Sequence, residues 1–388
     1  MDFNKITDRF HSDSCKWNVL ENELPMWVAD MDFEVAPEII DAIQKRLNHK
    51  IFGYTEMKDE LYYAYIKWWD KRHHFKIERE WLLFSTGVVP SISSIVRKLT
   101  SVGENVLLQA PVYNIFYNSI INNGRNVVSS DLLYVDGEYK IDWADLEEKL
   151  ADKQTTLMIL CNPHNPIGKI WDKETLAKIG KLCYDNNVLV LSDEIHCDLC
   201  AKGKEYVPFA SVNEINKMNS ITCISPTKAF NLAGFQTSMI CVSNPVIRHK
   251  VWRGINTDEI AEANTFATVV PVAAFNECGY WLDELREYID ENRKYATTFI
   301  KEEIPDLKLI KADATYLLWI DCSKLTEDAT HLCEFIREKT GLFVSNGYSY
   351  GQCGKTFIRV NIATQLERVK DGLNRLKTSI NLYKIHKQ

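Results

Sequence analysis

The sequence has no concentrated run of lysine or arginine, and its 46 basic residues are outnumbered by 53 acidic ones, for a formal net charge of −7. Nucleic-acid binding needs clustered positive charge to contact phosphates, so the composition argues against DNA or RNA as a partner. Internal repeats and low-complexity linkers are also lacking. With 46% hydrophobic and 26% charged residues over 388 positions, the chain is typical of a globular protein with room for two domains.

No stretch is long and apolar enough to span a bilayer, and the opening residues 1–8 lack the apolar core of a signal peptide. We therefore expect no membrane partner and a cytoplasmic location. The eleven cysteines are an odd number and lie singly in apolar segments, as Cys161 and Cys241 do. This pattern is typical of reduced cysteines in a hydrophobic core rather than of a disulfide framework.

The pair Cys197 and Cys200, next to His196, has a spacing found in metal sites. A structural zinc site needs four ligands, and no second Cys/His pair at ligand spacing supplies the other two. We therefore predict that the protein binds no metal.

Short, fully apolar runs alternate with amphipathic stretches in the first two thirds of the chain. They lie at residues 81–84, 105–108, 126–128, 156–160, 188–191, 220–224 and 238–242. Apolar strands separated by helices predict a mostly parallel sheet with both faces covered. We expect an α/β fold with a mostly parallel seven-stranded sheet flanked by helices.

Helical patterns lie on both sides of this region. Pro37 begins a predicted helix that runs to about residue 49, and an aromatic-rich helix spans about 59–72. A long helical region is expected over 245–302, with a potential kink at Pro271.

The C-terminal part predicts a smaller α+β domain. Its expected strands lie at 315–320 and 356–362, and its expected helices near 328–340 and 366–382. The predicted division is a large domain of residues 50–285 and a small domain built from residues 1–49 and 286–388.

Polar residues that follow the strands are the candidates for a site, because ligands bind beyond the carboxyl ends of parallel strands. Gly87 and Val88 begin a helix whose free N–H groups and dipole favour a phosphate. Tyr113 places an aromatic ring at the same edge. Asn165 lies in a turn with two Asn-Pro units, which holds its amide in a fixed direction.

Two ionisable residues complete this edge. Asp193 ends a buried strand, where a carboxylate is costly unless it meets a cation or N–H donors. Lys228 follows the run 220–224; a lone lysine is usually an ordinary surface residue. Taken together, the donors, ring, amide, carboxylate and amine suit a flat, cationic, phosphorylated heterocycle that bonds covalently to lysine.

The order and spacing of Asn165-Pro-x-Gly168, Asp193 and Ser225-x-x-Lys228 resemble the pyridoxal-phosphate signature of the aspartate aminotransferase superfamily, fold type I. Within it, the chain is similar to the MalY/PatB-like branch of cystathionine β-lyases and C–S lyases. The resemblance covers nearly the whole chain, including residues 16–17, 27–33, 86–90, 161–166, 193–196, 227–234 and 314–317. It implies pyridoxal 5′-phosphate as the cofactor.

The resemblance also implies a role for each candidate around the cofactor. Lys228 would bond covalently to it and take the substrate's Cα proton. Asp193 would pair with the pyridine nitrogen, Asn165 with the phenolic oxygen, and Tyr113 would lie on the ring face, with His196 beside the cofactor. The residues implied to hold the phosphate are Gly87, Val88, Ser225 and Thr227.

Tyr54 would reach the cofactor phosphate and substrate from a neighbouring subunit, which implies a homodimer with shared active sites. Several other tyrosines lie close to Tyr54 in sequence, so its assignment has competitors. Arg359 would bind the substrate carboxylate through a bidentate pair, helped by backbone near Ala29. Because Arg359 lies in mid-strand, a structural ion pair is the alternative role.

Two departures from the wider superfamily bear on the reaction. Gln236 lies where many aminotransferases carry an arginine after the lysine, and His196 stands where a tyrosine is common. Both match the C–S lyase branch, and we find no strong candidate for a second cationic site that would bind a dicarboxylate side chain.

The leading hypothesis is a pyridoxal-phosphate β-lyase for a small sulfur amino acid. It would cleave the Cβ–S bond of cystathionine, cysteine or a related cysteine S-conjugate by α,β-elimination, giving a thiol or sulfide, pyruvate and ammonia. The alternative is an aminotransferase on the same scaffold, since both reactions begin with Cα deprotonation. A cofactor-binding protein with a purely regulatory role has no sequence feature in its favour.

Overall fold

The computed structural model describes residues 1–386, and its centre is a seven-stranded sheet in the order β2-β10-β9-β8-β7-β3-β4. The strands are β2 (Leu82–Ser85), β3 (Asn105–Leu108), β4 (Asn126–Ser129), β7 (Thr155–Cys161), β8 (Leu189–Asp193), β9 (Ser220–Ile224) and β10 (Ser238–Cys241). β10 pairs antiparallel with β2 and β9, whereas the neighbours from β9 to β4 are parallel. The predicted α/β fold with a mostly parallel seven-stranded sheet is confirmed.

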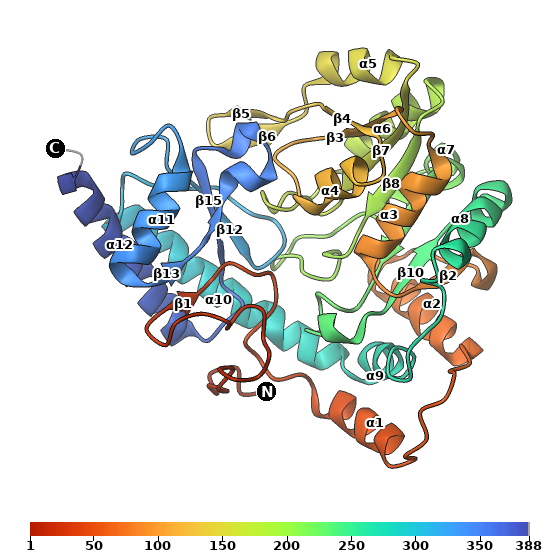
Figure 1. Ribbon diagram of the computed structural model, residues 1–388, viewed down its shortest axis with the longest axis horizontal. Helices are drawn as coiled ribbons and strands as arrows, with labels where there is room; N and C mark the ends of the chain where they lie inside the picture. The colour runs from red at the N-terminus through yellow and green to blue at the C-terminus, as the bar shows by residue number, and fades with distance from the viewer. Residues whose placement is uncertain (387–388) are drawn as a thin grey trace.

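Helices cover both faces of this sheet (Figure 1). One face packs against α3 (Val88–Leu99), α4 (Ile115–Ile121) and α8 (Pro245–Thr257), and the other against α5 (Trp143–Ala151) and α6 (Lys173–Asp185). In β7, Leu157 and Ile159 join the first layer, while Met158 and Leu160 join the second. Because successive side chains point to opposite faces, a strand buried on both faces is apolar throughout.

A second, antiparallel sheet lies in the C-terminal part, in the order β11-β12-β15-β14. Its strands are β11 (Lys308–Leu309), β12 (Leu317–Asp321), β14 (Ser345–Asn346) and β15 (Phe357–Asn361), and its helices are α11 (Ala329–Thr340) and α12 (Leu366–His386). The N-terminal segment joins this part, because β1 (Leu24–Pro25) pairs with β13 (Leu342–Phe343). Smaller elements are the hairpin β5 (Leu133–Val135) and β6 (Glu138–Lys140), and the short helix α7 (Glu214–Met218).

The long helical region expected over 245–302 is wrong in detail, because it is divided into α8, α9 (Val269–Glu277) and α10 (Gly279–Glu303). Pro271 is the third residue of α9 and causes no kink, since a proline in the first turn forfeits no hydrogen bond within the helix. None of the helices in residues 1–386 combines the length and the apolar composition of a membrane span.

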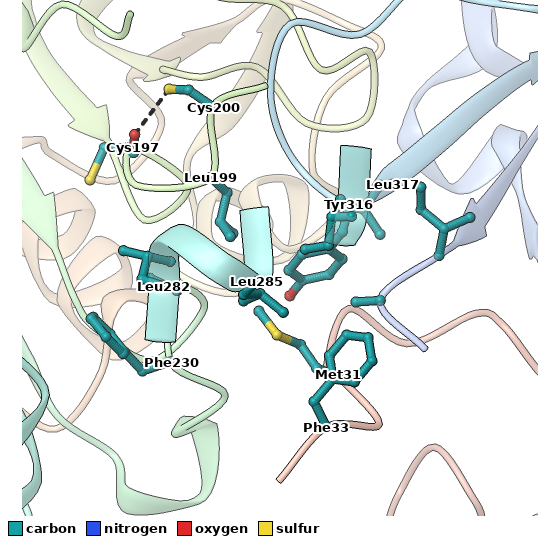
Figure 2. Close-up of a cluster of buried hydrophobic side chains, with 14 of the residues drawn as sticks. Met31, Phe33, Cys197, Leu199, Cys200, Phe230, Leu282, Leu285, Tyr316 and Leu317 are labelled. Carbon is teal, nitrogen blue, oxygen red and sulfur yellow. Dashed lines mark hydrogen bonds between the residues drawn. The ribbon is translucent and has the colours of Figure 1, made fainter. Parts of the chain in front are cut away.

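The remaining long helices, α1 (Pro37–Leu47) and α2 (Asp59–His73), agree with their predicted ranges, and both pack against α9. Figure 2 shows Leu285 of α10 beside Met31 of the N-terminal segment and Tyr316, within one shared hydrophobic core. The N-terminal segment therefore contacts elements from both predicted domains, and the exact division into domains stays a prediction.

Candidate functional site

A cavity of about 740 Å³ lies where the loops after β2, β3, β7, β8 and β9 meet the N-terminal segment and the smaller sheet. Ten of the predicted site residues line it: Ala29, Gly87, Val88, Tyr113, Asn165, Asp193, His196, Thr227, Lys228 and Arg359. The structure therefore brings most of the candidates together at the sheet edge that the strand pattern indicates.

Lys228 lies in the loop after β9, with its amine against the N-terminal segment. Its Nζ donates a hydrogen bond of 2.6 Å to the carbonyl oxygen of Ala29. Burial and the nearby positive charge of Arg359 lower the pKa of Lys228 to about 8, against opposing effects of two aspartates. The amine therefore loses its proton more readily than an ordinary lysine, as a nucleophile or base requires.

Asp193 is the last residue of β8 and is buried. Its Oδ1 accepts a 3.2 Å hydrogen bond from the N–H of Ile195. Burial raises the pKa of Asp193 to about 7, although that hydrogen bond and the charge of Lys228 act in the opposite direction. A carboxylate in this position gains from a cationic partner placed in the cavity.

Arg359 lies in the middle of β15 and is buried beside Asn165. Its Nη1 donates to Asn165 Oδ1 at 3.2 Å, and its Nη2 donates to the carbonyl oxygen of Trp27 at 2.9 Å. Its Nε is buried without a hydrogen-bond partner in residues 1–386. The partners are neutral oxygens rather than a carboxylate, so the guanidinium keeps its charge available to an anion.

Three aromatic residues surround the amine and the carboxylate. Burial, followed by the charges of Lys228 and Arg359, lowers the pKa of His196 to about 3, so its ring is neutral. Burial and the charge of Asp193 raise the pKa of Tyr113 to about 12, so its hydroxyl stays protonated. Tyr316, which has no role predicted from the sequence, donates its hydroxyl to the Ala29 oxygen at 3.0 Å.

The start of α3 faces the cavity through Gly87 and Val88, where backbone N–H groups have no partner within the helix. Ser225 does not line the cavity; its Oγ lies 2.8 Å from Thr227 Oγ1 and donates to the Thr237 carbonyl at 2.7 Å. Ser225 thus lies behind Thr227. Tyr54 is fully exposed and lies outside the cavity lining of its own chain.

Residues that hold the N-terminal segment over the cavity lie far away in the sequence. Asn361 donates from Nδ2 to the carbonyl oxygens of Val28 and Asp30, both at 2.6 Å. Below them, the buried Lys16 ammonium donates to Asp32 at 2.9 Å. Residues 16–17 and 27–33 belong to the sequence resemblance, but their part in supporting the Ala29 carbonyl could not be inferred without the fold.

The cavity extends beyond Lys228 to residues that the sequence does not single out. Trp27 stacks on Phe343 with ring centroids 4.8 Å apart, and the Arg337 guanidinium lies 3.9 Å from the Phe343 ring centroid. All three residues line the cavity. They come from the N-terminal segment, β13 and α11, so only the tertiary structure brings them together.

A group of potential metal ligands lies outside the cavity lining. Atoms of His73, Cys197 and Asp198 are within 4.8 Å of one another, and His73 Nε2 lies 2.9 Å from Asp198 Oδ1. Trp68 also donates to Asp198 Oδ1, at 2.9 Å. The predicted absence of a metal stays a prediction.

The cavity fits pyridoxal phosphate on the chemistry of its residues. Asp193 offers a buried carboxylate to a ring nitrogen, and Lys228 offers an amine of lowered pKa to an aldehyde. His196 keeps Nδ1 buried without a partner in the described chain, and the α3 N-terminus at Gly87 suits a phosphate. The residues that would hold the cofactor are therefore present in one place.

Comparison with known proteins agrees with this site. A family model described as aminotransferase class I and II matches residues 22–376. Cystathionine beta-lyase PatB of Bacillus subtilis is 40% identical over 98% of this chain and 100% of its own, and Protein MalY of Escherichia coli is 29% identical over 98% of both. Cystalysin from Treponema denticola, solved with pyridoxal 5′-phosphate, has a TM-score of 0.95 and 33% identity, covering 98% of each chain.

Proposed function

The chain belongs to the aminotransferase class I and II family, and we propose that it is a pyridoxal-phosphate-dependent C–S β-lyase. With one water, it converts cystathionine, cysteine or a related S-conjugate into pyruvate, ammonia and a thiol or sulfide. The observation that carries the proposal is the full-length similarity to PatB in a chain whose cavity holds both Lys228 and Asp193.

Pyridoxal phosphate, when bound, supplies a ring that accepts the electron pair left when an amino acid loses its Cα proton. Lys228 would hold this cofactor through Nζ, and the same amine would accept the Cα proton. Its pKa of about 8 leaves an appreciable neutral fraction near physiological pH. Asp193 keeps the ring nitrogen protonated, which increases the ring's capacity for negative charge.

The other candidate residues would hold and orient the cofactor. Asn165 would donate its amide to the cofactor's phenolic oxygen, Tyr113 would hold the ring, and His196 would lie beside it as a neutral ring. Gly87, Val88, Thr227 and, behind them, Ser225 form the phosphate site. Their positions around one cavity support these roles.

Arg359 binds the substrate carboxylate. Its guanidinium already donates to neutral oxygens of Asn165 and Trp27, so an arriving carboxylate meets a positioned cation whose charge is not compensated by an ion pair in residues 1–386. Backbone near Ala29, a residue that also lines the cavity, would complete the substrate-binding edge.

The proposal includes a homodimer with shared active sites and a cytoplasmic location. Tyr54 is fully exposed, and its neighbours Ile51 and Phe52 are 67% and 53% exposed, which supports a partner surface there. Eleven free cysteines, most of them buried, support a reducing compartment.

Pyruvate release from a panel of sulfur amino acids, measured without any added 2-oxo acid, tests the proposal. The lyase forms pyruvate from cystathionine, cysteine and S-alkyl cysteines. An enzyme that forms pyruvate from none of them, and instead transfers their amino group to an added 2-oxo acid, would be the aminotransferase of the alternative hypothesis.

A further inference from the structure

The far wall of the cavity contains a positively charged group at a fixed position. Arg337 of α11 lines the cavity and lies over Phe343, which stacks in turn on Trp27. The carbonyl of Trp27 is an acceptor for Arg359 at 2.9 Å. A continuous wall of stacked groups therefore connects the proposed site for the substrate's α-carboxylate with the second guanidinium.

Glu23 holds Arg337 in place without using all of its donors. Arg337 Nε donates to Glu23 Oε1 at 2.6 Å and Nη2 donates to Oε2 at 3.0 Å. Nη1 lies outside this bidentate pair. The guanidinium is thus positioned, and its charge is partly compensated before any ligand binds.

A carboxylate accompanies this guanidinium on the same helix. Glu334 precedes Arg337 by one turn of α11 and also lines the cavity. Its side chain is 70% exposed, and its Oε2 lies 3.4 Å from Nδ1 of His331, which is 85% exposed. Residues three apart on a helix share a face, so the cavity rim presents one cationic and one anionic group side by side.

We propose that Arg337 and Glu334 form a subsite for the distal amino acid end of a thioether substrate. Arg337 contacts the distal carboxylate and Glu334 contacts the distal ammonium. The inference rests on the proposed lyase function and assigns its preferred substrate class: S-substituted cysteines that end in a second α-amino acid group, as cystathionine does.

Competing substrate classes match these groups less well. A dicarboxylic amino acid has a distal carboxylate for Arg337 but no ammonium to pair with Glu334. A purely apolar S-substituent packs on the Trp27 and Phe343 rings but leaves both charges unused. A zwitterionic end pairs with both groups and adds no net charge.

Four substrates separate the contributions of the two groups. L-cystathionine carries both distal charges, S-(3-carboxypropyl)-L-cysteine the carboxylate, S-(3-aminopropyl)-L-cysteine the ammonium, and S-propyl-L-cysteine neither. The variants are Glu334→Gln, Arg337→Gln and Arg337→Lys, and the matched control is Glu338→Gln on the same helix but outside the cavity lining. The measured quantity is kcat/KM for pyruvate release by the holoenzyme, expressed relative to S-propyl-L-cysteine.

We expect Glu334→Gln to lower this ratio about 5-fold for cystathionine and the aminopropyl substrate, but not for the carboxypropyl substrate, a modest effect because Glu334 is exposed. Arg337→Gln lowers the ratio about 10-fold for cystathionine and the carboxypropyl substrate, and Arg337→Lys restores part of it. Glu338→Gln changes no ratio.

Equal ratios in wild type and in both variants, or a wild type that shows no preference for cystathionine over S-propyl-L-cysteine, would overturn the subsite. Turnover of S-propyl-L-cysteine by each variant shows that the variant is folded and loaded with cofactor. If the wild type releases pyruvate neither from the four substrates nor from cysteine, the lyase proposal itself fails, so the two failures are distinct.

Discussion

The amine of Lys228 donates a 2.6 Å hydrogen bond to the carbonyl oxygen of Ala29, a residue 199 positions earlier in the chain. Tyr316 donates its hydroxyl to the same oxygen at 3.0 Å. The reactive amine is therefore positioned by the N-terminal segment as well as by its own loop. The chemistry of the site depends on how firmly that segment is held.

The rate at which the cofactor-free protein captures pyridoxal phosphate reports the ionisation of Lys228. Burial and the Arg359 charge lower the pKa of Lys228 to about 8. Below that pH the neutral fraction of the amine rises about tenfold per pH unit, and above it the fraction is nearly constant. The rate at which the visible absorbance of the bound cofactor increases should rise with pH up to about pH 8 and then level off. A rise that continues unchanged to about pH 10 would mean an ordinary lysine.

Two variants control this experiment, and stability gives an independent measure. Lys228→Ala develops no such absorbance, whereas Lys169→Ala, outside the cavity lining, behaves as wild type.

Because the pKa of Lys228 in the folded protein lies below its unfolded value of 10.5, the unfolded chain binds more protons than the folded protein between about pH 8 and 10.5. The cofactor-free wild type therefore gains stability relative to Lys228→Met as pH rises through that window.

Asp193→Asn keeps the shape of the side chain and removes its negative charge. We expect weaker cofactor binding and a kcat lowered about 100-fold or more at saturating pyridoxal phosphate, because the ring nitrogen loses its counter-ion. Cofactor titration followed by steady-state pyruvate release measures both effects. An unchanged kcat at full loading would remove Asp193 from the proposed mechanism.

The pair Lys16–Asp32 supports the segment that carries Ala29, and its side chains are only 1% and 2% exposed. We expect Asp32→Asn to lower the free energy of unfolding by about 3–5 kcal/mol, because the buried Lys16 ammonium keeps only the more distant Asp30, at 3.7 Å, as an ionic partner. The double variant Lys16→Met with Asp32→Leu should recover much of that loss. Urea denaturation of the cofactor-free proteins measures this; a loss below about 1 kcal/mol for Asp32→Asn would contradict it.

The Lys16–Asp32 pair also predicts the direction in which the stability of the protein changes in acid. Burial acts to raise the pKa of Asp32, but the charges of Lys16 and Arg9 and the hydrogen bond from Trp17 bring it below the ordinary 3.8. The stabilisation is therefore complete above about pH 4 and is lost as the pH falls through the lower, folded value. Asp32→Asn should show a smaller loss of stability with acid than wild type.

Complementation between subunits tests the shared active site. Tyr54 is fully exposed on its own chain, so we predict that it acts on the partner's cavity. Lys228→Ala and Tyr54→Ala should each have little activity alone, while mixed dimers regain activity because one of their two sites has both residues. Mass spectrometry verifies that mixed dimers have formed. If these mixtures stay as inactive as the two single variants, Tyr54 does not belong to a shared site.

The sheet was predictable because most of its strands, the edge strand β4 excepted, are largely buried on both faces. The run Ser220–Ile224 is buried throughout and mostly apolar, and its bounds match the prediction. Two-residue strands such as β13 and β14 have no periodicity of their own and exist only through pairing with β1 and β15. The break between α8 and α9 lies at residues 258–268 and so comes before Pro271, the residue at which the sequence suggested a kink.

Site residues were predictable where they directly follow strands. Asp193 and Lys228 lie at the ends of neighbouring parallel strands, so adjacency follows from the sheet itself. Tyr316 and Arg337 could not be assigned, because Tyr316 contacts the Ala29 carbonyl from the residue before β12 and Arg337 lines the cavity from α11. No local pattern specifies where these elements of the smaller sheet and its helices are placed. The roles of all these residues stay predictions.

The number of pyruvate molecules formed per subunit from L-cystathionine, with no 2-oxo acid present, tests the central claim most directly. A C–S β-lyase regenerates its cofactor in every cycle, so we predict hundreds of pyruvate molecules per subunit, with homocysteine and ammonia in equal amounts. At most one product per subunit, with the cofactor left in its amine form, would contradict the lyase function.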